Sequence, residues 1–293
     1  MHLVTFSESN TIRIGILDVL LSEIVDVSRV DSTLGLDMLS LIERGEQGLS
    51  ALKKIQNSYA ERIPLGEVKL LAPIPVPRRN IICVGKNYRE HVQEVQASFA
   101  VGDDVIPKAP IFFTKATTAV IATDEAIPAS DDPTESVDYE GELGVIIGRG
   151  GKAIEQENAK SHIFGYTIIN DVTSRRLQKK HHQWYLGKSL DGFCPMGPSI
   201  VIADDQFNIS NWCIETRVNN ELRQQGSVNQ MIFNIERLIE TLSQYMTLLP
   251  GDIIATGTPA GVGMGFSPPK FLTPGDRVEI TIDPIGCLTN HVE

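Results

Sequence analysis

Acidic and basic residues between positions 91 and 188 could together form one chemical site. They are His91 and Glu94, Glu140 and Glu142, Asp171, and Lys188. Carboxylate oxygens are the ligands that hard divalent cations prefer, and the basic side chains that follow suit an anionic ligand. The combination predicts a metal-dependent enzyme.

Glu140 and Glu142 lie in VDYEGELGVIIG, a segment with the composition of a strand. Alternate residues of a strand point to the same face, which places the two carboxylates about 7 Å apart along the backbone. They repel each other unless a cation lies between them. A solvated strand face is the alternative, but the apolar run Leu143–Ile147 favours a buried pair.

Asp171 follows the apolar run HIFGYTIIN, where a strand gives way to a predicted helix. Arg175 and Gln178 come four and seven positions later, so all three side chains are expected on one helical face. The alternatives are a helix N-cap and an ordinary intrahelical Asp–Arg pair. Lys188 stands in a Gly/Pro-rich stretch, either solvated or reaching a buried site to hold an enolate or carboxylate oxygen.

The segment NYREHVQE predicts a short helix capped by Asn87, with His91 and Glu94 as neighbours three positions apart. A carboxylate beside an imidazole stabilises the imidazolium, so the pair could act as a general base. A surface helix pair is the alternative. His181 and His182 in KKHHQ are expected at a solvated helix end.

Composition and charge exclude several classes of protein. A net charge of -11 argues against nucleic acid as a partner, because its binding needs a basic surface. The apolar segment Ile12–Val25 contains three charged residues, so no membrane span is predicted and the cytoplasm is the expected compartment. The cysteines lack metal-ligand spacing and are expected to be buried small apolar residues; they are Cys83, Cys194, Cys213 and Cys287.

The chain divides at the proline-rich segment 71–80, where prolines hold the backbone extended. Residues 1–72 predict a small α+β domain with helices over Gly35–Arg44 and Leu49–Arg62. Residues 73–293 are rich in short strands, with a helix over Ile235–Met246 behind an Asn234 cap. The strands are expected at Leu3–Phe6, Ile12–Leu17, Ile24–Val27, Ile81–Val84, Ile111–Phe113, Tyr139–Ile147, Ile163–Ile169, Ile214–Val218, Asp252–Thr256 and Arg277–Ile282. This favours a β-dominated α+β fold.

The motifs NYREHVQE, DYEGELGVIIG, NDVTSRRLQ, GKSLDGFCPMGP, VNNELRQQG and GDIIATGTPAGVG follow one another over residues 81–263. This series resembles the catalytic domain of the fumarylacetoacetate hydrolase superfamily, and residues 1–72 resemble the small N-terminal domain of many members. The resemblance implies a mixed β-roll and a homodimer. It also implies Mg²⁺, or alternatively Mn²⁺ or Ca²⁺, bound by Glu140, Glu142 and Asp171.

The same resemblance implies roles for the other motif residues. His91 and Glu94 would be the water-activating dyad on a lid. Substrate oxygens would be held by Lys188, Arg175 and Gln178, with Thr258 on the carboxylate and Arg223 and Gln224 as further candidates. The chain departs from the commoner NDxTARDxQ pattern at Ser174 and Arg176, and the added charge of Arg176 bears on the substrate assignment.

The activity implied is metal-dependent hydrolysis of a C–C bond in 2,4-dioxo acids such as acylpyruvates, releasing pyruvate or a related acid. Oxaloacetate decarboxylation and isomerisation or hydration of oxo-dienoates remain alternatives, because all of these reactions share a metal-stabilised enolate. A metal-binding scaffold without turnover is the non-enzymatic alternative.

Overall fold

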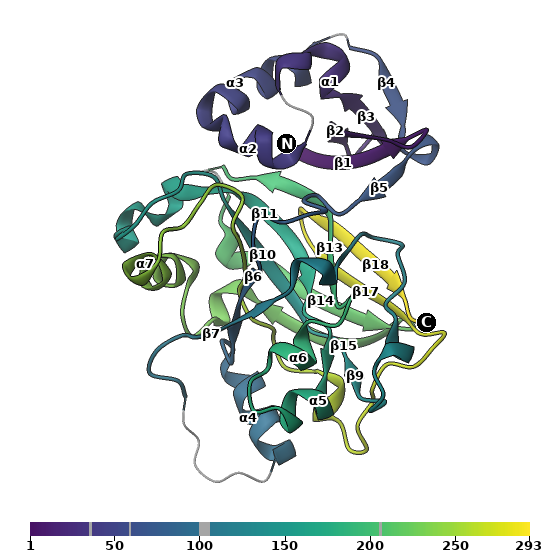
Figure 1. Ribbon diagram of the computed structural model, residues 1–293, viewed down its shortest axis with the longest axis vertical. Coiled ribbons are helices and arrows are strands. Elements are labelled where there is room, and N and C mark those ends of the chain that lie inside the picture. Colours follow the sequence, from purple (N-terminus) through teal and green to yellow (C-terminus); the bar gives the residue numbers. More distant parts are fainter. Residues whose placement is uncertain (35–36, 59, 100–105, 205–206) are drawn as a thin grey trace.

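The computed structural model describes residues 1–34, 37–58, 60–99, 106–204 and 207–293 (Figure 1). Strands dominate the fold, which confirms the predicted α+β class. Helices lie at α1 (Val27–Val30), α2 (Met38–Glu43), α3 (Gly45–Gln56), α4 (Arg89–Phe99), α5 (Arg175–Lys180), α6 (Tyr185–Lys188) and α7 (Ile235–Tyr245). None of the helices in these ranges has the length and apolar character that crossing a bilayer requires.

A large mixed sheet runs through the molecule in the order β4-β3-β2-β1-β13-β11-β10-β16-β6-β7, with β5 paired to β1 and β8 to β13. Its first strands are β1 (His2–Glu8), β2 (Thr11–Asp18), β3 (Glu23–Asp26), β4 (Arg62–Pro64) and β5 (Lys69–Leu71). The others are β6 (Ile81–Gly85), β7 (Ile111–Lys115), β8 (Val120–Ile121), β10 (Gly141–Ile147), β11 (Ile163–Asn170), β13 (Cys194–Ile202) and β16 (Ile253–Ala255).

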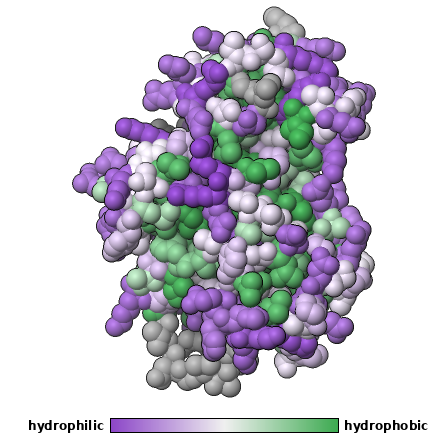
Figure 2. Space-filling view, viewed as in Figure 1, coloured by the Kyte–Doolittle hydropathy of each residue, from purple (hydrophilic) through white to green (hydrophobic). Residues whose placement is uncertain are grey.

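A second sheet has the order β15-β14-β17-β18, and a two-stranded ladder joins β9 to β12. The bounds are β14 (Cys213–Val218), β15 (Glu221–Ser227), β17 (Arg277–Ile282), β18 (Gly286–His291), β9 (Val137–Asp138) and β12 (Thr173–Ser174). In Figure 1 the N-terminal elements lie at the top and α4, α5 and α6 at the opposite end. Figure 2 shows apolar side chains in the middle of this face, framed by hydrophilic ones.

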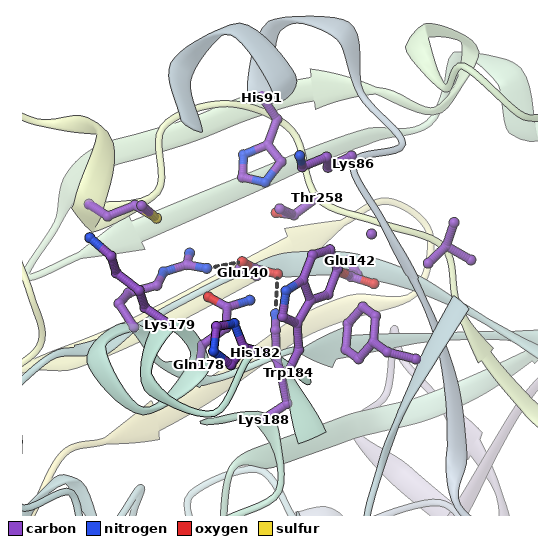
Figure 3. A pocket seen from close by; sticks show the side chains of 15 residues that line it. Lys86, His91, Glu140, Glu142, Gln178, Lys179, His182, Trp184, Lys188 and Thr258 are labelled. Atoms are coloured by element: carbon purple, nitrogen blue, oxygen red, sulfur yellow. Dashed lines mark hydrogen bonds and ion pairs between the residues drawn. The ribbon is translucent and has the colours of Figure 1, made fainter. Parts of the chain in front are cut away.

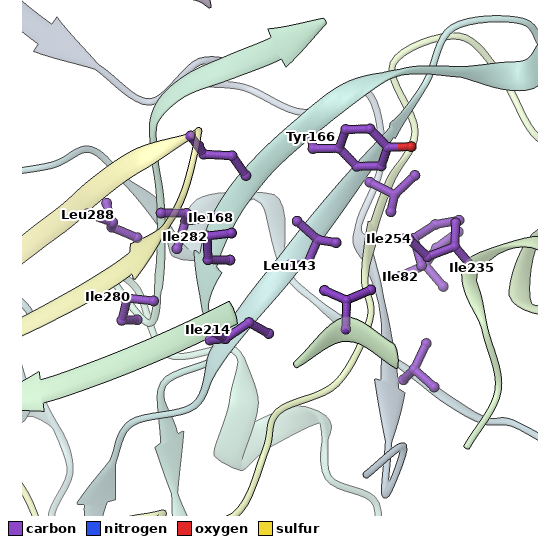
Figure 4. Packing of buried hydrophobic residues seen from close by; sticks show 14 of the residues in the cluster. Ile82, Leu143, Tyr166, Ile168, Ile214, Ile235, Ile254, Ile280, Ile282 and Leu288 are labelled. Carbon is purple, nitrogen blue, oxygen red and sulfur yellow. The ribbon is translucent and has the colours of Figure 1, made fainter. Parts of the chain in front are cut away.

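Strand β10 divides its side chains between the two faces of the large sheet. Leu143, Val145 and Ile147 pack in the core that includes Ile214 and Ile280 of the second sheet (Figure 4). Ile146 belongs to the core on the opposite side. Because side chains alternate along a strand, Glu142 shares the face of Ile146, and the sheet-to-sheet core holds the strand that carries the acidic residues.

The N-terminal strands join the large sheet through β1, which pairs antiparallel with β13 (His2↔Val201). The core beneath them also crosses the junction, since Leu3 and Leu41 belong to the same cluster as Ile200. The division between residues 72 and 73 stays a prediction.

Several predicted elements need correction. The second N-terminal helix ends at Gln56, and Arg62 begins β4 instead. The first begins at Met38, while positions 35 and 36 lie outside the described residues. Sequence reasoning did not predict β13, β15 or β18. Strand β13 contains Pro195 and Pro198, although proline cannot donate to a ladder. Cys287 is exposed and Cys213 only half-buried, contrary to expectation.

Candidate active site

Three carboxylates meet at the end of the β10–β11 pair. Glu142 lies in β10, Glu140 just before it, and Asp171 just after β11. The antiparallel ladder brings the ends together, and the Asp171 amide donates to the Glu140 carbonyl at 2.9 Å. One oxygen from each carboxylate lies within 4.8 Å of the others, and all three side chains are buried. The structure therefore brings the predicted acidic triad together.

Lys188 lies between two of these carboxylates. Its Nζ donates to Glu140 Oε2 at 2.8 Å and to Asp171 Oδ2 at 2.7 Å, and its side chain is 2% exposed. Burial lowers the pKa of Lys188, but Asp171 and Glu140 outweigh that effect and the pKa is raised overall. Lys188 is thus a buried ammonium, as its proposed contact with the site required.

Arg175 contacts the triad from the start of α5. Its Nη1 lies 2.7 Å from Glu140 Oε1, and its Nε donates to Asp138 Oδ2 at 2.8 Å. The remaining nitrogen, Nη2, is buried and has no hydrogen-bond partner among the described residues. A buried donor of this kind costs free energy unless it is hydrogen-bonded, so Nη2 is suited to an oxygen of a ligand.

Asp171 is not on the helical face of Arg175 and Gln178, and that prediction was wrong. Residue 171 precedes the two-residue strand β12, and α5 begins only at Arg175 behind Ser174. Gln178 does line the same cavity as Arg175. Arg176 is exposed and donates to the Thr134 carbonyl outside the cavity, which corrects the expected effect of its charge on the site.

Two residues that sequence reasoning missed complete the charge pattern. Lys115, at the end of β7, is fully buried, and its Nζ donates to Asp171 Oδ1 at 2.7 Å. Asp138 accepts from the Gly263 amide at 2.6 Å in addition to Arg175. Four buried carboxylates therefore face three buried cations, which leaves one negative charge for a further cation to balance.

Among the described residues, Glu142 is the carboxylate of this group without an ion pair. Its Oε2 accepts from the Gly257 amide at 2.8 Å. Burial raises the pKa of Glu142 well above its ordinary value, and the nearby Asp171 and Glu140 carboxylates raise it further. Burial also raises the pKa of Glu140, but Lys188 and Arg175 outweigh it and the pKa is lowered overall.

The donor set fits a hard divalent cation. The converging atoms are all carboxylate oxygens, the chemistry that Mg²⁺, Mn²⁺ and Ca²⁺ share. Burial, and then the neighbouring Asp171 and Glu140 carboxylates, raise the pKa of Glu142, and a bound cation would offset the repulsion between these carboxylates. Glu140, Glu142 and Asp171 are the residues that would hold the ion.

Helix α4 places His91 over the triad. The His91 side chain is buried, and its Nδ1 lies 3.4 Å from Glu94 Oε2. The Glu94 carboxylate also accepts from the Gly261 amide, at 2.9 and 3.1 Å, which fixes it to the loop before the turn at Gly263–Gly265. The predicted neighbours are together, with the carboxylate anchored by a loop remote in sequence.

Asn87 does not follow the predicted role at the start of this helix. Its side chain accepts from the Phe233 amide at 2.9 Å and donates to the carbonyls of Phe233 and Thr256, at 3.0 and 2.7 Å. Asn87 therefore ties the segment before α4 to two other loops.

A cavity of about 300 Å³ joins Glu140 and Glu142 of the triad to the surface (Figure 3). In Figure 3, His91 and Lys86 lie on the α4 side, while Gln178 and Lys188 lie on the opposite side of Glu140. Residues that sequence reasoning did not place here also line it: Lys86, Phe113, Lys179, His182, Trp184 and Met264. His182 is exposed as expected, yet it reaches the cavity.

Thr258 lines the cavity, but its hydroxyl proton is already used. Its Oγ1 donates to the Gly141 carbonyl at 2.9 Å and accepts from Gln224 Nε2 at 2.7 Å. Gln224 is fully buried behind it and supports Thr258 from outside the cavity lining. Arg223 also lies outside the lining and stacks over the Phe266 ring at 5.3 Å.

Comparison with known proteins identifies the family. The model described as "Fumarylacetoacetate (FAA) hydrolase C-terminal" matches residues 80–293. The chain belongs to the fumarylacetoacetate hydrolase family, a family of enzymes, as the motifs predicted.

Named relatives cover several reactions. Oxaloacetate tautomerase YisK of Bacillus subtilis is 54% identical over 228 residues, 78% of this chain and 74% of the relative. The structure of a fumarylacetoacetate hydrolase from Exiguobacterium antarcticum is 42% identical, with a TM-score of 0.85 over 100% of this chain and 99% of that one. A 2-hydroxyhepta-2,4-diene-1,7-dioate isomerase from Mycobacterium marinum is 32% identical, with a TM-score of 0.76 over 100% and 98%.

Proposed function

We propose that this protein catalyses keto–enol tautomerisation of a 2-oxo dicarboxylate, oxaloacetate, with Mg²⁺ held by Glu140, Glu142 and Asp171. The observation that carries the proposal is the buried acidic triad, two of whose members, Glu140 and Glu142, line one cavity together with His91. The identity with oxaloacetate tautomerase supports the choice of substrate. Mn²⁺ and Ca²⁺ are the alternative ions.

When bound, the ion would polarise the 2-oxo group and so acidify the neighbouring C–H bond. Arg175 Nη2 and the ammonium of Lys188 bind the oxygens of the 2-oxo carboxylate, whose negative charge they match. Gln178 adds an amide on the same side of the cavity.

His91 moves the proton. Its ring takes a proton from C3 of the keto form, and the electron pair passes to the 2-oxo oxygen. The protonated ring then gives the proton to that oxygen, which forms the enol and regenerates the neutral imidazole. Glu94 holds the ring from Nδ1, which leaves Nε2 for the substrate. Lys188 and Arg175, both buried beside Glu140, meet the enolate charge.

Hydrolysis of 2,4-dioxo acids is the second candidate. The His91–Glu94 pair could equally activate a water for attack on the remote carbonyl, and the Exiguobacterium protein is named as a hydrolase. Decarboxylation of oxaloacetate and isomerisation of oxo-dienoates would use the same enolate. The products separate these reactions: enol, pyruvate with a second acid, CO₂, or a shifted double bond.

The decisive experiment supplies Mg²⁺ and follows loss of enol absorbance from fresh oxaloacetate, with pyruvate and CO₂ assayed in parallel. Asp171→Asn and Glu140→Gln should remove both Mg²⁺ binding and catalysis, while the surface change Glu157→Gln should retain them. Catalysis by a chelator-treated protein would reject the proposal. Mg²⁺ binding without turnover on oxaloacetate and acylpyruvates would indicate the scaffold alternative.

His91→Asn tests the proton transfer separately from the metal. Loss of a positioned general base lowers kcat by about 10²- to 10⁴-fold, with Mg²⁺ affinity unchanged. An undiminished kcat would assign the proton transfer to another residue. The homodimer and the cytoplasmic location stay predictions, and light scattering in solution tests the first.

A further inference from the structure

Lys86 is held in the left-handed region of the backbone, with φ of 56°. A non-glycine residue pays strain for this conformation, so surrounding structure must impose it. On one side, a Cβ at Gly85 would lie 2.4 Å from the Trp184 ring, which requires glycine there. On the other, Asn87 is fully buried and bonded to two loops. The backbone therefore fixes where the Lys86 side chain starts.

The Lys86 side chain lines the cavity and is half-buried. It forms no hydrogen bond or ion pair with any residue in the described ranges. The cations beneath it are already engaged: Lys188 bonds Glu140 and Asp171, and Arg175 bonds Asp138 and Glu140. Lys86 is thus a positive charge that no carboxylate of the described residues pairs with.

Lys86 lies on the side of the cavity opposite Lys188 (Figure 3). This position suggests an anionic group at the far end of the ligand. In Figure 3, Lys86 lies beside Thr258 on the His91 side of the cavity, across Glu140 from Lys188. The 2-oxo carboxylate of a monocarboxylate acid alone would suffice to contact Arg175, Lys188 and an ion held by the triad. A dicarboxylate carries a second charge that needs a partner on the other side.

Resting on the proposed function, we propose that Lys86 binds the distal carboxylate of the substrate and favours tautomerisation over decarboxylation. Decarboxylation breaks the C3–C4 bond, leaves its electron pair as the enolate and releases the distal carboxylate as neutral CO₂. An ammonium paired with that carboxylate stabilises the charge that must disappear, so it opposes the reaction. Tautomerisation moves a proton from C3 to the 2-oxo oxygen and leaves the distal charge intact.

The test compares Lys86→Met with Lys86→Arg and with Lys180→Met, an exposed lysine outside the cavity. Met retains the length and the backbone strain of residue 86 but removes its charge. We expect Lys86→Met to raise KM for oxaloacetate about tenfold, the effect of one lost ion pair. The ratio of the rate of CO₂ release to the rate of tautomerisation should also rise. Turnover of phenylpyruvate, which has no distal carboxylate, should change less than about twofold. Lys86→Arg should restore the wild-type preference, and Lys180→Met should keep it.

The inference would be overturned if Lys86→Met impaired turnover of oxaloacetate and phenylpyruvate equally, or changed neither. It would also be overturned if Lys179→Met, and not Lys86→Met, caused the selective loss on oxaloacetate. A binding measurement separates it from the proposed function. Calorimetry with Mg²⁺ should show the wild type binding 2-oxoglutarate more tightly than 2-oxobutyrate, and Lys86→Met losing that preference. If the protein showed this Lys86-dependent preference but no tautomerase activity, the proposed function would be rejected and the role of Lys86 retained. If the wild type bound both acids equally, the role of Lys86 would be rejected.

Discussion

Lys115 and Asp171 form an ion pair that is closed off from solvent. Nζ lies 2.7 Å from Oδ1, and both side chains are 0% exposed. The same ammonium donates to the Val172 carbonyl at 2.9 Å. Since the other oxygen of Asp171 bonds Lys188, Lys115 fixes the orientation of the carboxylate in the triad.

Lys115→Met should destabilise the protein strongly. Removing one partner of a buried pair leaves an uncompensated charge, which costs about 3–5 kcal/mol in the free energy of unfolding. Urea denaturation measures this, with Lys69→Met as the matched control at an exposed ion pair with Glu125, where a change within about 0.5 kcal/mol is expected. A loss below about 1 kcal/mol at Lys115 would show that Asp171 is oriented without it.

Metal binding should release a proton from Glu142. Because burial and the adjacent carboxylates raise the pKa of Glu142, the metal-free site retains a proton that the ion must displace. Affinity for Mg²⁺ should therefore rise with pH and fall as acid is added. Calorimetry in two buffers of different ionisation enthalpy measures the released proton. Proton release equal in wild type and Glu142→Gln would exclude Glu142 as its source.

Gly265→Ala should disturb the contact of helix α4 with the loop at Gly261 and spare the metal site. A Cβ at Gly265 would lie 2.1 Å from Glu94 Oε1 and 2.5 Å from its Cγ, so the carboxylate must leave the Gly261 amide. Since Glu94 holds His91, we expect kcat to fall about tenfold or more with Mg²⁺ affinity unchanged.

Gly66→Ala is the matched control, because a Cβ there meets nothing within 4 Å. Equal kinetics for the two alanine variants would show that the contact between Glu94 and the loop does not position His91.

His2 should make stability depend on pH. Burial, and secondarily the positive N-terminus, lower the pKa of His2 from 6.5 to about 4. Between these values the unfolded chain binds a proton that the folded protein refuses, so the free energy of unfolding falls as pH decreases from 6.5 towards 4. The loss should reach about 2 kcal/mol, below the full shift because the ring is only partly shielded.

Chemical denaturation across this pH range measures the effect. His2→Gln should flatten the pH dependence, while the exposed His181→Gln should leave it as in the wild type. If the free energy of unfolding depended on pH identically in the wild type and His2→Gln, a group other than His2 would cause the dependence. Because His2 contacts Ser199 at 3.2 Å, the experiment also probes the junction of β1 with β13.

The local pattern was sufficient for much of the site. Alternation in a strand placed Glu140 and Glu142 on one face, and a spacing of three placed His91 beside Glu94. It failed where tertiary contacts compete with local rules. Asn87 had the composition of a helix cap, yet its amide bonds loops 146 and 169 positions away along the chain.

The sequence by itself determined the strand-rich class, through residue types at short, regular spacings, and the family, through the order of its motifs. The acidic triad was predicted through the resemblance to that family. Only the tertiary structure decided which charges balance one another. Lys115, Asp138 and Lys86 come from segments with no local pattern that marks them, and their roles arise from burial and distance after distant strands have paired. Ion pairs between residues far apart in the sequence depend on the distances between them in the folded protein, and the periodicity of the sequence does not predict those distances.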